Sequence, residues 1–424
     1  MDTHFHKSRP NIDASVVLPS SKSLSHRALI TASLADGDSL IHGISESKDT
    51  EATMNVLSHL GVQFERVQEG ILVHGVGGKL AYDGAVMDCN ESGSTLRFLI
   101  PIFSLCKERV RFTGRGRLME RPQDVYVDIF SKQGLMFQQD SSGITIEGAL
   151  QPGNYEVDGS ISSQFITGLL CTLPLLDGDS TITVLPPYES QSYVKLTLQA
   201  LQRAHIVIRQ EGYTYYIPGN QTYAVDEIHV EGDDSSMAFF AVLSVLTHTP
   251  FSITNIAHDS LQGDHVILDI LKNMGVKVEE IDNGYRCTCD TLHATDIDLA
   301  DCPDLGPVLF ALASQAEGTT TFRHIQRLRM KESDRIACME KELHALGVDM
   351  HSTRDIAYVK GKTQIKGGVT LSGHNDHRIV MALSVLSAIA EKPVIIEGAQ
   401  AVDKSYPDFF KDLEKTGVSV KYAE

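Results

Sequence analysis

Cations and hydroxyl side chains gather where the chain is expected to enter its helices. In the first such segment Lys22, Ser23 and Arg27 adjoin an apolar run, and Ser23 or Ser25 is the expected N-cap. Backbone N–H groups are unpaired at a helix start, and the helix dipole is positive there, so the segment could hold a phosphate or carboxylate group. An ordinary capped helix with solvated charges is the alternative when this segment is taken alone.

Similar polar segments recur along the chain, and a nearly all-apolar helix is expected after most of them. The segments are 92–97, 160–164, 232–236, 301–304 and 375–378, and the apolar runs are 98–106, 165–176, 238–246, 308–316 and 379–390. Helices that are apolar on all sides are buried on most of them. Between these segments a second pattern repeats at a spacing of roughly 70 residues, made of a short amphipathic helix, a Gly and an alternating strand. One copy has His205 in place of the Gly, so a different helix cap is expected there.

The two patterns together predict six strand–helix–strand–helix–strand–strand units. A linear solenoid is one possible arrangement. The buried helices favour closure into two lobes of three units each, an α/β fold. The predicted lobes are 21–231 and 1–20 plus 232–424, with hinges near 19–22 and 230–234. The strand expected at 12–18 would complete a sheet of the second lobe, and a cleft lined by helix N-termini is expected between the lobes.

Composition narrows the partners. Lys and Arg total 37 against 55 Asp and Glu, a net charge of −18, so neither nucleic acid nor an anionic membrane is an expected partner. Seven Cys without a Cys-x-x-Cys pair indicate reduced thiols in the cytoplasm rather than disulfides or a zinc site. No apolar signal core begins the chain, and the apolar runs are too short to cross a bilayer. Cations gathered at helix starts of so acidic a protein therefore predict an anionic substrate.

Eight motifs, taken together and in order, resemble the 5-enolpyruvylshikimate-3-phosphate synthase family. They are Pro-x-Ser-Lys-Ser-x-Ser-x-Arg at 19–27, Ser-Gly-Ser-Thr-x-Arg at 92–97, Glu-Arg-Pro at 120–122, Asp-Gly-Ser-x-Ser-Ser-Gln-Phe at 158–165, Glu-Gly-Asp-x-Ser-Ser at 231–236, Lys-Glu-Ser-Asp-Arg at 331–335, Asn-Asp-His-Arg at 375–378 and Lys-Ser-Tyr-Pro-Asp-Phe-Phe at 404–410. The resemblance runs from about residue 10 to the end of the chain. It implies a fold of two inside-out α/β barrels, in agreement with the repeat.

The resemblance also implies an activity. Members transfer the enolpyruvyl group of phosphoenolpyruvate to the 5-hydroxyl of shikimate 3-phosphate and release phosphate, by addition and elimination. This step belongs to the shikimate pathway, which leads to chorismate and the aromatic amino acids, and glyphosate inhibits it. No cofactor and no metal ion are implied, and we expect a cytoplasmic monomer whose partners are these two small molecules.

The site residues implied by the resemblance fall into three sets. For shikimate 3-phosphate they are Lys22, Ser23, Arg27, Ser162, Ser163, Gln164, Ser190, Tyr193, Asp304, Arg327 and Lys331. For phosphoenolpyruvate they are Lys22, Gly93, Arg121, Gln164, Arg335, Arg378 and Lys404. The catalytic set is Lys22, Asp304, Glu332 and His377. We expect Asp304 to take the proton of the 5-hydroxyl, and Glu332 with Lys22 to serve the methylene carbon and the leaving phosphate.

Some positions depart from the family pattern. Glu91 and Arg327 each stand where members often have Asn, and Ser20 and His26 replace a frequent Gly and Asn. An extra carboxylate at Glu91 could lower affinity for phosphoenolpyruvate or its analogues, and this leaves the sensitivity to glyphosate open. Arg327 could add a charged contact to the substrate phosphate.

Other interpretations are less favoured. The sister enolpyruvyl transferase that acts on UDP-N-acetylglucosamine usually carries a reactive Cys in a loop that corresponds to 114–122, which has none here. A non-catalytic repeat scaffold would not need the cations and carboxylates at matching positions. A metal site at His374 and His377 is less favoured than a polar contact at a helix start, because no third ligand is evident. His4 and His6 are expected in a frayed terminus.

Overall fold

The computed structural model describes residues 1–6 and 11–423. The chain divides into two compact units, Ser20–Val230 and Met1–Pro19 with Glu231–Glu424. We call them the 20–230 unit and the split unit, and we describe each by itself. The sequence-based boundaries lie one residue further along the chain at both junctions.

The 20–230 unit alternates helices with short strands. Its elements are α1 (Lys22–Leu34), β3 (Asp36–His42), α2 (Lys48–Ser58), β4 (Gln63–Val67), β5 (Gly70–Val76), β6 (Val86–Asp88), α3 (Gly93–Ser104), β7 (Val110–Thr113), η1 (Leu118–Glu120), α4 (Asp124–Lys132), β8 (Met136–Asp140), β9 (Gly143–Glu147), β10 (Asn154–Asp158), α5 (Ser163–Thr172), η2 (Leu173–Leu175), β11 (Ser180–Leu185), α6 (Gln191–Arg203), β12 (Arg209–Glu211), β13 (Thr214–Ile217) and β14 (Glu227–His229).

From α7 to β22 the split unit repeats the order of helices and strands seen from α1 to β10. Its elements are β1 (Asp2–His6), β2 (Ser15–Val17), α7 (Asp234–Thr247), β15 (Ser252–Thr254), η3 (Gly263–Val266), α8 (Ile267–Asn273), β16 (Lys277–Ile281), β17 (Gly284–Thr288), β18 (Asp296–Asp298), η4 (Pro303–Leu305), α9 (Gly306–Ala313), β19 (Thr319–Arg323), η5 (Gln326–Met330), α10 (Arg335–Ala345), β20 (Met350–Ser352), β21 (Ile356–Lys360), β22 (Thr370–Ser372), α11 (His377–Ser387), β23 (Val394–Glu397), η6 (Ala399–Lys404), α12 (Phe409–Lys415) and β24 (Ser419–Ala423).

The strands form four-stranded sheets, three in each unit. Their orders are β14-β3-β5-β4, β6-β7-β9-β8 and β10-β11-β13-β12 in the 20–230 unit, and β16-β17-β15-β2, β18-β19-β21-β20 and β22-β23-β1-β24 in the split unit. Every sheet joins one parallel pair to two antiparallel pairings; in the second sheet β6 runs parallel to β7, and β9 pairs antiparallel with both β7 and β8. The predicted α/β class and the sixfold repeat are confirmed.

Three sheets include a strand from a distant part of the chain, and two of these strands, β2 and β14, lie next to the unit junctions. In the 20–230 unit β14 pairs with β3, which lies far earlier in the sequence. In the split unit β2 pairs with β15. The expectation that a strand within 12–18 completes a sheet of the second lobe is therefore confirmed, although the strand itself is shorter. The chain consequently passes from one unit to the other twice.

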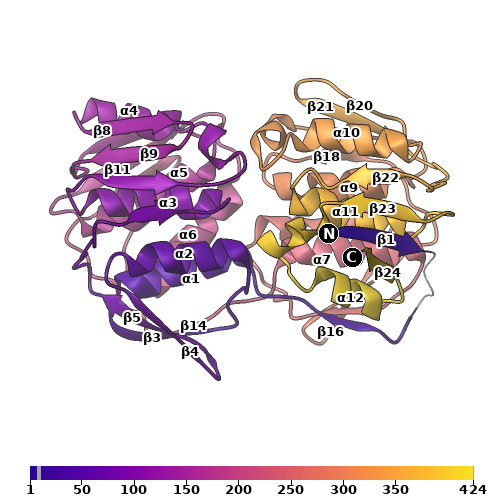
Figure 1. Cartoon of the computed structure of the whole chain (residues 1–424), viewed down its shortest axis with the longest axis horizontal. Coiled ribbons are helices and arrows are strands. Elements are labelled where there is room, and N and C mark those ends of the chain that lie inside the picture. Colours follow the sequence, from indigo (N-terminus) through magenta and orange to yellow (C-terminus); the bar gives the residue numbers. More distant parts are fainter. Residues whose placement is uncertain (7–10, 424) are drawn as a thin grey trace. The chain divides into compact units, whose positions relative to one another are not determined.

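The N-terminal strand β1 corrects one expectation. The terminus was predicted to fray, but β1 pairs antiparallel with both β23 and β24 in the yellow part of the chain (Figure 1). Phe5 is 1% exposed, and its ring centroid lies 6.2 Å from that of Phe410. The strand takes the place that β9 has in its own sheet, next to the parallel pair. Because pairing partners lie almost at the other end of the chain, no local pattern indicates them.

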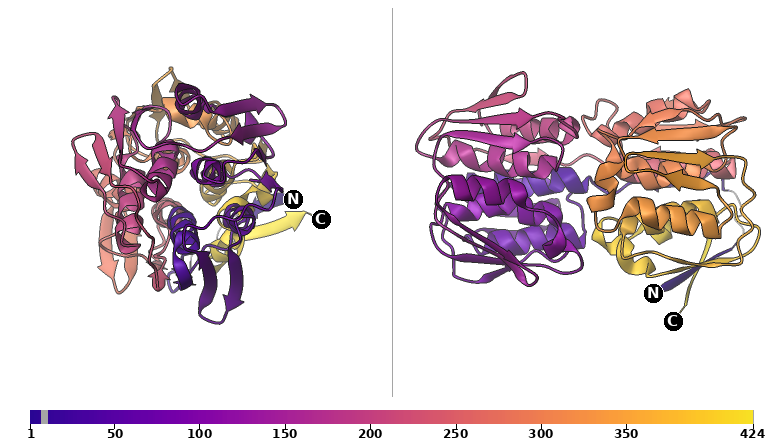
Figure 2. Two further views of the ribbon diagram at one scale, coloured as in Figure 1. Left: turned by 90° about the vertical axis from the view of Figure 1, so that its left-hand side faces the viewer. Right: turned by 90° about the horizontal axis from the view of Figure 1, so that it is seen from above.

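Apolar helices occupy the interior of each unit. Leu29 in α1, Leu99 in α3 and Leu169 in α5 are fully buried, as is Leu309 in α9. In the left view of Figure 2 the helices of the 20–230 unit group together, and its strand hairpins lie around them. The prediction that all-apolar runs form buried helices is confirmed. Among the described residues, no helix is both long and apolar enough to cross a membrane.

The helix cap at His205 also differs from expectation. His205 adopts the left-handed conformation with φ +63°, the same region that Gly61 occupies with φ +92° in the first copy of the repeat. The cap therefore keeps its backbone geometry, and His205 adopts a conformation that is uncommon outside glycine.

Candidate active site

The 20–230 unit places Lys22 in the first turn of α1. The N-cap is Ser21, so the prediction of Ser23 or Ser25 was wrong by two or more residues. The Nζ atom of Lys22 lies 2.9 Å from Oδ2 of Asp49 in α2. The other carboxylate oxygen of Asp49 is buried without a hydrogen-bond partner among the described residues. Sequence reasoning missed Asp49, whose position carries no signal apart from its place in the first turn of a helix.

Arg27 joins α1 to α6. Its Nε donates to Oγ1 of Thr197 at 2.9 Å, Nη1 donates to the carbonyl of Ser23 at 2.6 Å, and Nη2 donates to the carbonyl of Tyr193 at 2.8 Å. Burial lowers the pKa of Arg27 to about 10. Arg27 thus fixes the backbone of two residues that the resemblance assigns to shikimate 3-phosphate.

Arg97 plays a similar part between α3 and α5. It donates to Oε1 of Gln164 at 2.9 Å and to the carbonyl of Pro122 at 2.8 Å, and its guanidinium carbon lies 4.7 Å from the ring centroid of Phe165. The amide of Gln164 donates in turn to Oγ of Ser94 at 3.1 Å. The sequence indicates Arg97 as a cation at a helix start, but the family resemblance assigns it to neither substrate and to no catalytic role. Its contacts orient Gln164.

Arg121 lies against the first turn of α3, where only glycine leaves room. A Cβ atom on Gly93 would lie 2.6 Å from Nη1 of Arg121. Arg121 is 8% exposed, and its Nε is buried without a hydrogen-bond partner among the described residues. A buried guanidinium with an unused donor at a helix N-terminus suits an anionic ligand.

Three serines mark the starts of α5 and α6. Ser162 is the N-cap of α5 and accepts from the backbone N–H of Gln164 at 3.3 Å, and Ser163 is the first residue of that helix. Ser190 is the N-cap of α6 and has φ +54°. All three are buried. A hydrogen bond of 2.8 Å between the hydroxyls of Thr167 and Thr197 connects the two helices.

In the split unit, cations converge on Asp304 in η4. Its Oδ1 lies 2.8 Å from Nη1 of Arg335 and 3.2 Å from Nζ of Lys331, and its Oδ2 lies 3.2 Å from Nη2 of Arg378. The structure therefore brings four of the predicted site residues into direct contact. They come from η4, from the residue that follows η5 and from the starts of α10 and α11.

Arg335 is buried among carboxylates. Besides Asp304, its Nη2 lies 2.7 Å from Oε2 of Glu332 and its Nε lies 2.9 Å from Oδ2 of Asp376. Burial opposes its charge, but the carboxylates of Asp376, Glu332 and Asp304 outweigh burial and raise the pKa of Arg335 above its usual value. Asp376 was missed as a site residue, although it lies inside the motif at 375–378. It is the N-cap of α11 and also accepts from the hydroxyl of Ser333 at 2.9 Å.

Lys331, which also contacts Asp304, can lose its positive charge near neutral pH. Burial lowers its pKa to about 8, against the attraction of Asp304. Lys404 donates to the carbonyl of Asn375 at 2.6 Å, which holds its ammonium group beside the start of α11. Arg327 lies in η5 and is 7% exposed.

His377 is the first residue of α11 and is 2% exposed. Its Nδ1 lies 4.0 Å from Oδ1 of Asp376. The alternative of a metal site at His374 and His377 gains no support, since His374 pairs with Oε1 of Glu342 at 2.7 Å and neither His belongs to a described group of three possible ligands.

We group the predicted site residues, together with Arg97 and Asp376, into one cluster in each unit. The 20–230 cluster comprises Lys22, Ser23, Arg27, Gly93, Arg97, Arg121, Ser162, Ser163, Gln164, Ser190 and Tyr193. The Asp304 cluster comprises Asp304, Arg327, Lys331, Glu332, Arg335, Asp376, His377, Arg378 and Lys404. Lys22, Gly93, Ser163, Arg335 and Arg378 lie in the first turn of a helix, as the sequence predicts, whereas Arg327 and Lys404 lie in the short helices η5 and η6.

Comparison with known proteins places the chain in a family. Residues 7–413 match the family model described as EPSP synthase (3-phosphoshikimate 1-carboxyvinyltransferase). The 3-phosphoshikimate 1-carboxyvinyltransferase of Clostridium novyi is 41% identical over 417 residues, which cover 96% of this chain and 95% of the relative. That of Clostridium kluyveri is 42% identical over 409 residues, with the same coverage.

Solved structures agree with this result. EPSP synthase from Acinetobacter baumannii superposes with a TM-score of 0.82 at 25% identity, covering 99% of this chain and 100% of that one. The enolpyruvyl transferase NikO from Streptomyces tendae has the same TM-score at 16% identity, and this likeness concerns the fold alone. A shared fold does not by itself establish an activity, so the family assignment rests on the family model and the sequence relatives. The chain belongs to the EPSP synthase family, the 3-phosphoshikimate 1-carboxyvinyltransferases of the shikimate pathway.

Proposed function

We propose that the two clusters are the substrate-binding and catalytic groups of this activity. The 20–230 cluster supplies Ser23, Arg27, Ser162, Ser163, Ser190 and Tyr193 for shikimate 3-phosphate, with Lys22 and Gln164 serving both substrates. The Asp304 cluster adds Asp304, Arg327 and Lys331 for the same substrate. Phosphoenolpyruvate is assigned to Gly93 and Arg121 in one cluster and to Arg335, Arg378 and Lys404 in the other.

The contact of Asp304 with three cations carries the chemical proposal. Lys331, Arg335 and Arg378 fix the position of the Asp304 carboxylate, which can take up a proton once the bound substrates draw these cations away. We assign it the proton of the 5-hydroxyl when that oxygen attacks the second carbon of phosphoenolpyruvate. The same proton is not needed again in the elimination, because the ether oxygen of the product keeps its new bond to carbon.

Glu332 and Lys22 are assigned to the methylene carbon and to the leaving phosphate. The addition needs a proton donor for the methylene carbon, and the elimination removes a proton from the resulting methyl group while phosphate leaves. Glu332 is ion-paired with Arg335. If the carboxylate of phosphoenolpyruvate takes that guanidinium as its partner, Glu332 loses its counter-charge and takes up a proton more readily.

Helix starts support the assignment for the phosphate of shikimate 3-phosphate. Ser162 and Ser163 stand where α5 begins, so hydroxyls and unpaired backbone N–H groups occur together. Arg27 donates its hydrogen bonds to a hydroxyl and two carbonyl oxygens, none of which carries a negative charge that would offset its own. These features favour a phosphate over an uncharged sugar.

The direct test is an assay of phosphate release with both substrates and with each omitted. Turnover should require phosphoenolpyruvate and shikimate 3-phosphate together, and UDP-N-acetylglucosamine should not replace the latter. Release of phosphate from phosphoenolpyruvate with the sugar nucleotide as the sole acceptor would contradict the proposal. Parallel calorimetry with shikimate 3-phosphate on the Ser162→Ala variant tests the helix-start assignment separately from turnover.

We further infer a cytoplasmic monomer that glyphosate inhibits. The seven cysteines are all free, which suits a reducing compartment. Light scattering after size exclusion tests the monomer, and an inhibition curve against phosphoenolpyruvate tests glyphosate.

A further inference from the structure

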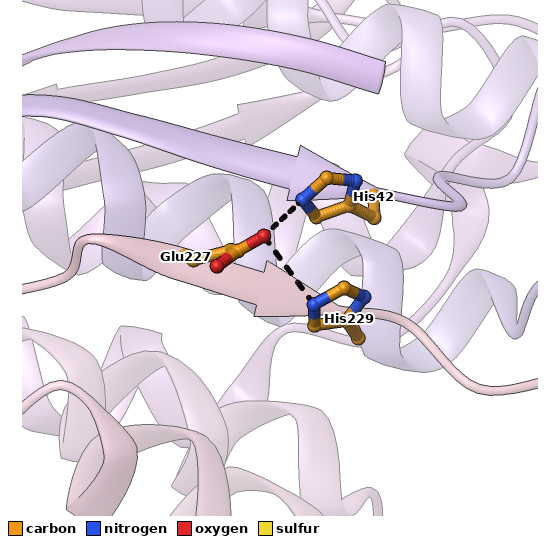
Figure 3. Close-up of side chains that lie close together, drawn as sticks. All are labelled: His42, Glu227 and His229. Carbon is orange, nitrogen blue, oxygen red and sulfur yellow. Dashed lines mark hydrogen bonds and ion pairs between the residues drawn. The ribbon is translucent and has the colours of Figure 1, made fainter. Parts of the chain in front are cut away.

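Two histidines and a glutamate outside both clusters meet on one sheet of the 20–230 unit. His42 ends β3, while Glu227 and His229 begin and end the neighbouring strand β14. In the parallel pairing His229 is the register partner of His42. Residues two apart on a strand share a face, so Glu227 lies on the same side as His229. Figure 3 shows the three side chains turned toward one another.

The distances suit a shared ion. Oε1 of Glu227 lies 2.5 Å from Nε2 of His42 and 3.4 Å from Nε2 of His229. The two rings stack with centroids 4.3 Å apart, and one possible ligand atom from each residue lies within 4.8 Å of the others. Zinc binds such atoms at about 2.0–2.2 Å in a tetrahedron, which separates neighbouring ligand atoms by about 3.3 Å. Small side-chain rotations would therefore centre an ion among the three.

The hydrogen bond of Nδ1 in His42 indicates which ring nitrogen carries the proton and which one faces the Glu227 carboxylate. Its Nδ1 lies 2.9 Å from the backbone carbonyl of Glu69. A carbonyl can only accept, so Nδ1 carries the proton, and in the neutral ring Nε2 has a lone pair. That lone pair points at a carboxylate oxygen, which is unfavourable unless a proton or a metal ion lies between them. Histidines that bind metals commonly donate their other N–H to a carbonyl in this way.

We propose that His42, Glu227 and His229 bind one divalent transition-metal ion, with zinc as the preferred ion and water in the fourth position. Two imidazoles and a carboxylate suit zinc, whereas magnesium and calcium prefer oxygen ligands alone. The net charge of −18 attracts cations in general, but only these ligand types select among them.

The position of the site defines its role. β14 is the edge strand of its sheet, and the chain leaves the unit one residue after His229. An ion held by β3 and β14 would stabilise the pairing of that edge strand. The side chains of His42 and His229 are 22% and 74% exposed, so the ion exchanges with solvent.

A second group of possible ligands is less suitable. In the group of Glu340, His344 and His351, Nε2 of His344 bonds to the carbonyl of Met350 at 2.7 Å, and Nε2 of His351 lies 2.7 Å from Oδ1 of Asp349. Glu340 also accepts from the hydroxyl of Ser352 at 2.6 Å. These atoms already have partners that point elsewhere.

The test uses the full chain without a purification tag, treated with a chelator and titrated with Zn²⁺ by calorimetry. We expect one equivalent to bind, and His229→Ala and Glu227→Gln each to weaken binding at least tenfold. The matched control is His59→Ala. His59 pairs with a single carboxylate, Asp83, at 2.7 Å in the same unit, so this variant should bind Zn²⁺ like the parent chain. Mg²⁺ should not compete.

Two further readouts keep the test decisive. Zn²⁺ should raise the melting temperature of the parent chain and of His59→Ala but not that of His229→Ala, while the metal-free proteins melt alike. Co²⁺ should give visible bands of a nitrogen and oxygen site. No Zn²⁺ binding beyond that of His229→Ala would mean that the short contact is an ordinary imidazolium–carboxylate pair and would overturn the proposal. A thiolate-to-cobalt band would overturn it as well, because it would place the ion on cysteine.

Discussion

The two clusters differ in what surrounds their cations. In the 20–230 cluster Arg27 and Arg97 donate to hydroxyl, amide and backbone oxygens. In the Asp304 cluster Arg335 meets three carboxylates, and Asp304 meets three cations. Arg27 is thus held by neutral oxygens, although Lys22 in the same cluster is paired with Asp49, whereas Lys331, Arg335 and Arg378 of the Asp304 cluster each contact at least one carboxylate.

This difference suggests a division of labour, in which the 20–230 cluster mainly binds anions and the Asp304 cluster also transfers protons. A guanidinium held by neutral oxygens can attract a phosphate without first giving up an ionic partner. In the Asp304 cluster an incoming anion must compete with carboxylates, but those carboxylates can accept and donate protons. We therefore expect changes in the Asp304 cluster to reduce turnover most, and changes in the 20–230 cluster to act mainly on affinity.

The largest effect is expected for Asp304→Asn. The amide cannot accept the proton of the 5-hydroxyl, and three cations lose their shared counter-charge, so kcat should fall by about 10²–10⁴-fold. Steady-state phosphate release at saturating substrate measures it. Asp301→Asn removes an exposed carboxylate three residues away and should leave kcat nearly unchanged. Near-normal turnover of Asp304→Asn with both ligands bound would remove the chemical role from this cluster.

Gly93→Ala should act on affinity. The new Cβ would lie 2.6 Å from Nη1 of Arg121, so the guanidinium must move away from the start of α3. A displacement near 1 Å at a binding group costs up to about 10²-fold, so KM for phosphoenolpyruvate should rise by roughly 10- to 100-fold with a smaller change in kcat. Gly93→Ser should raise KM for phosphoenolpyruvate more than Gly93→Ala does, because its side chain is larger. Affinity for shikimate 3-phosphate, measured by calorimetry, serves as the internal control, and an equal loss there would point to general damage of the unit.

Lys331 predicts a pH dependence within the Asp304 cluster. Its pKa of about 8 means that the ammonium group loses its proton above pH 8 in the free protein. If the charge holds shikimate 3-phosphate, kcat/KM for that substrate should fall about tenfold per pH unit above pH 8. Lys331→Arg keeps its charge and should flatten this limb. A profile of the parent chain that stays level to pH 9.5 would contradict the assignment.

Loss of the proton from Lys331 has the opposite effect on folding stability from the one it has on substrate binding. Between pH 8 and the usual pKa of a lysine, the unfolded chain binds a proton that the folded chain has lost. Stability therefore rises with pH across this window, while binding of the substrate weakens. Denaturant unfolding of the parent chain and of Lys331→Met at both ends of the window separates the two effects.

Sequence patterns could predict the repeat and the helix starts, because these depend on local periodicity and on residue types at caps. They could not predict β1, whose partners β23 and β24 lie at the far end of the chain. Nor could they predict that His205 keeps the backbone geometry of the glycines at equivalent positions.

The site shows the same limit. Motifs indicated Arg335 and Arg378, and the family resemblance indicated Asp304, but neither showed that these side chains would contact one another. Asp49 and Asp376 were missed because an ionic partner is chosen by helix packing and not by neighbours in sequence. Buried cations must be paired, so a search for their counter-charges is the step that sequence alone cannot complete.

Glu91→Asn should give the smallest effect of these variants. It tests whether a carboxylate near the 20–230 cluster weakens the binding of an anion there. Glu91 precedes the N-cap of α3 by one residue, and a Cβ on Gly116 would lie 2.5 Å from its Oε2, so its carboxylate lies against the loop that leads to Arg121. It is half-buried and close to solvent, so its repulsion of phosphoenolpyruvate is weak. KM for phosphoenolpyruvate and the inhibition constant of glyphosate should each fall by about threefold.

This gain in affinity should shrink as ionic strength rises. The control is Glu120→Gln, which removes an exposed carboxylate on the same loop and should change neither constant. A gain that persists at high salt would instead indicate a change in hydrogen bonding at the start of α3, and the charge of Glu91 would no longer explain it.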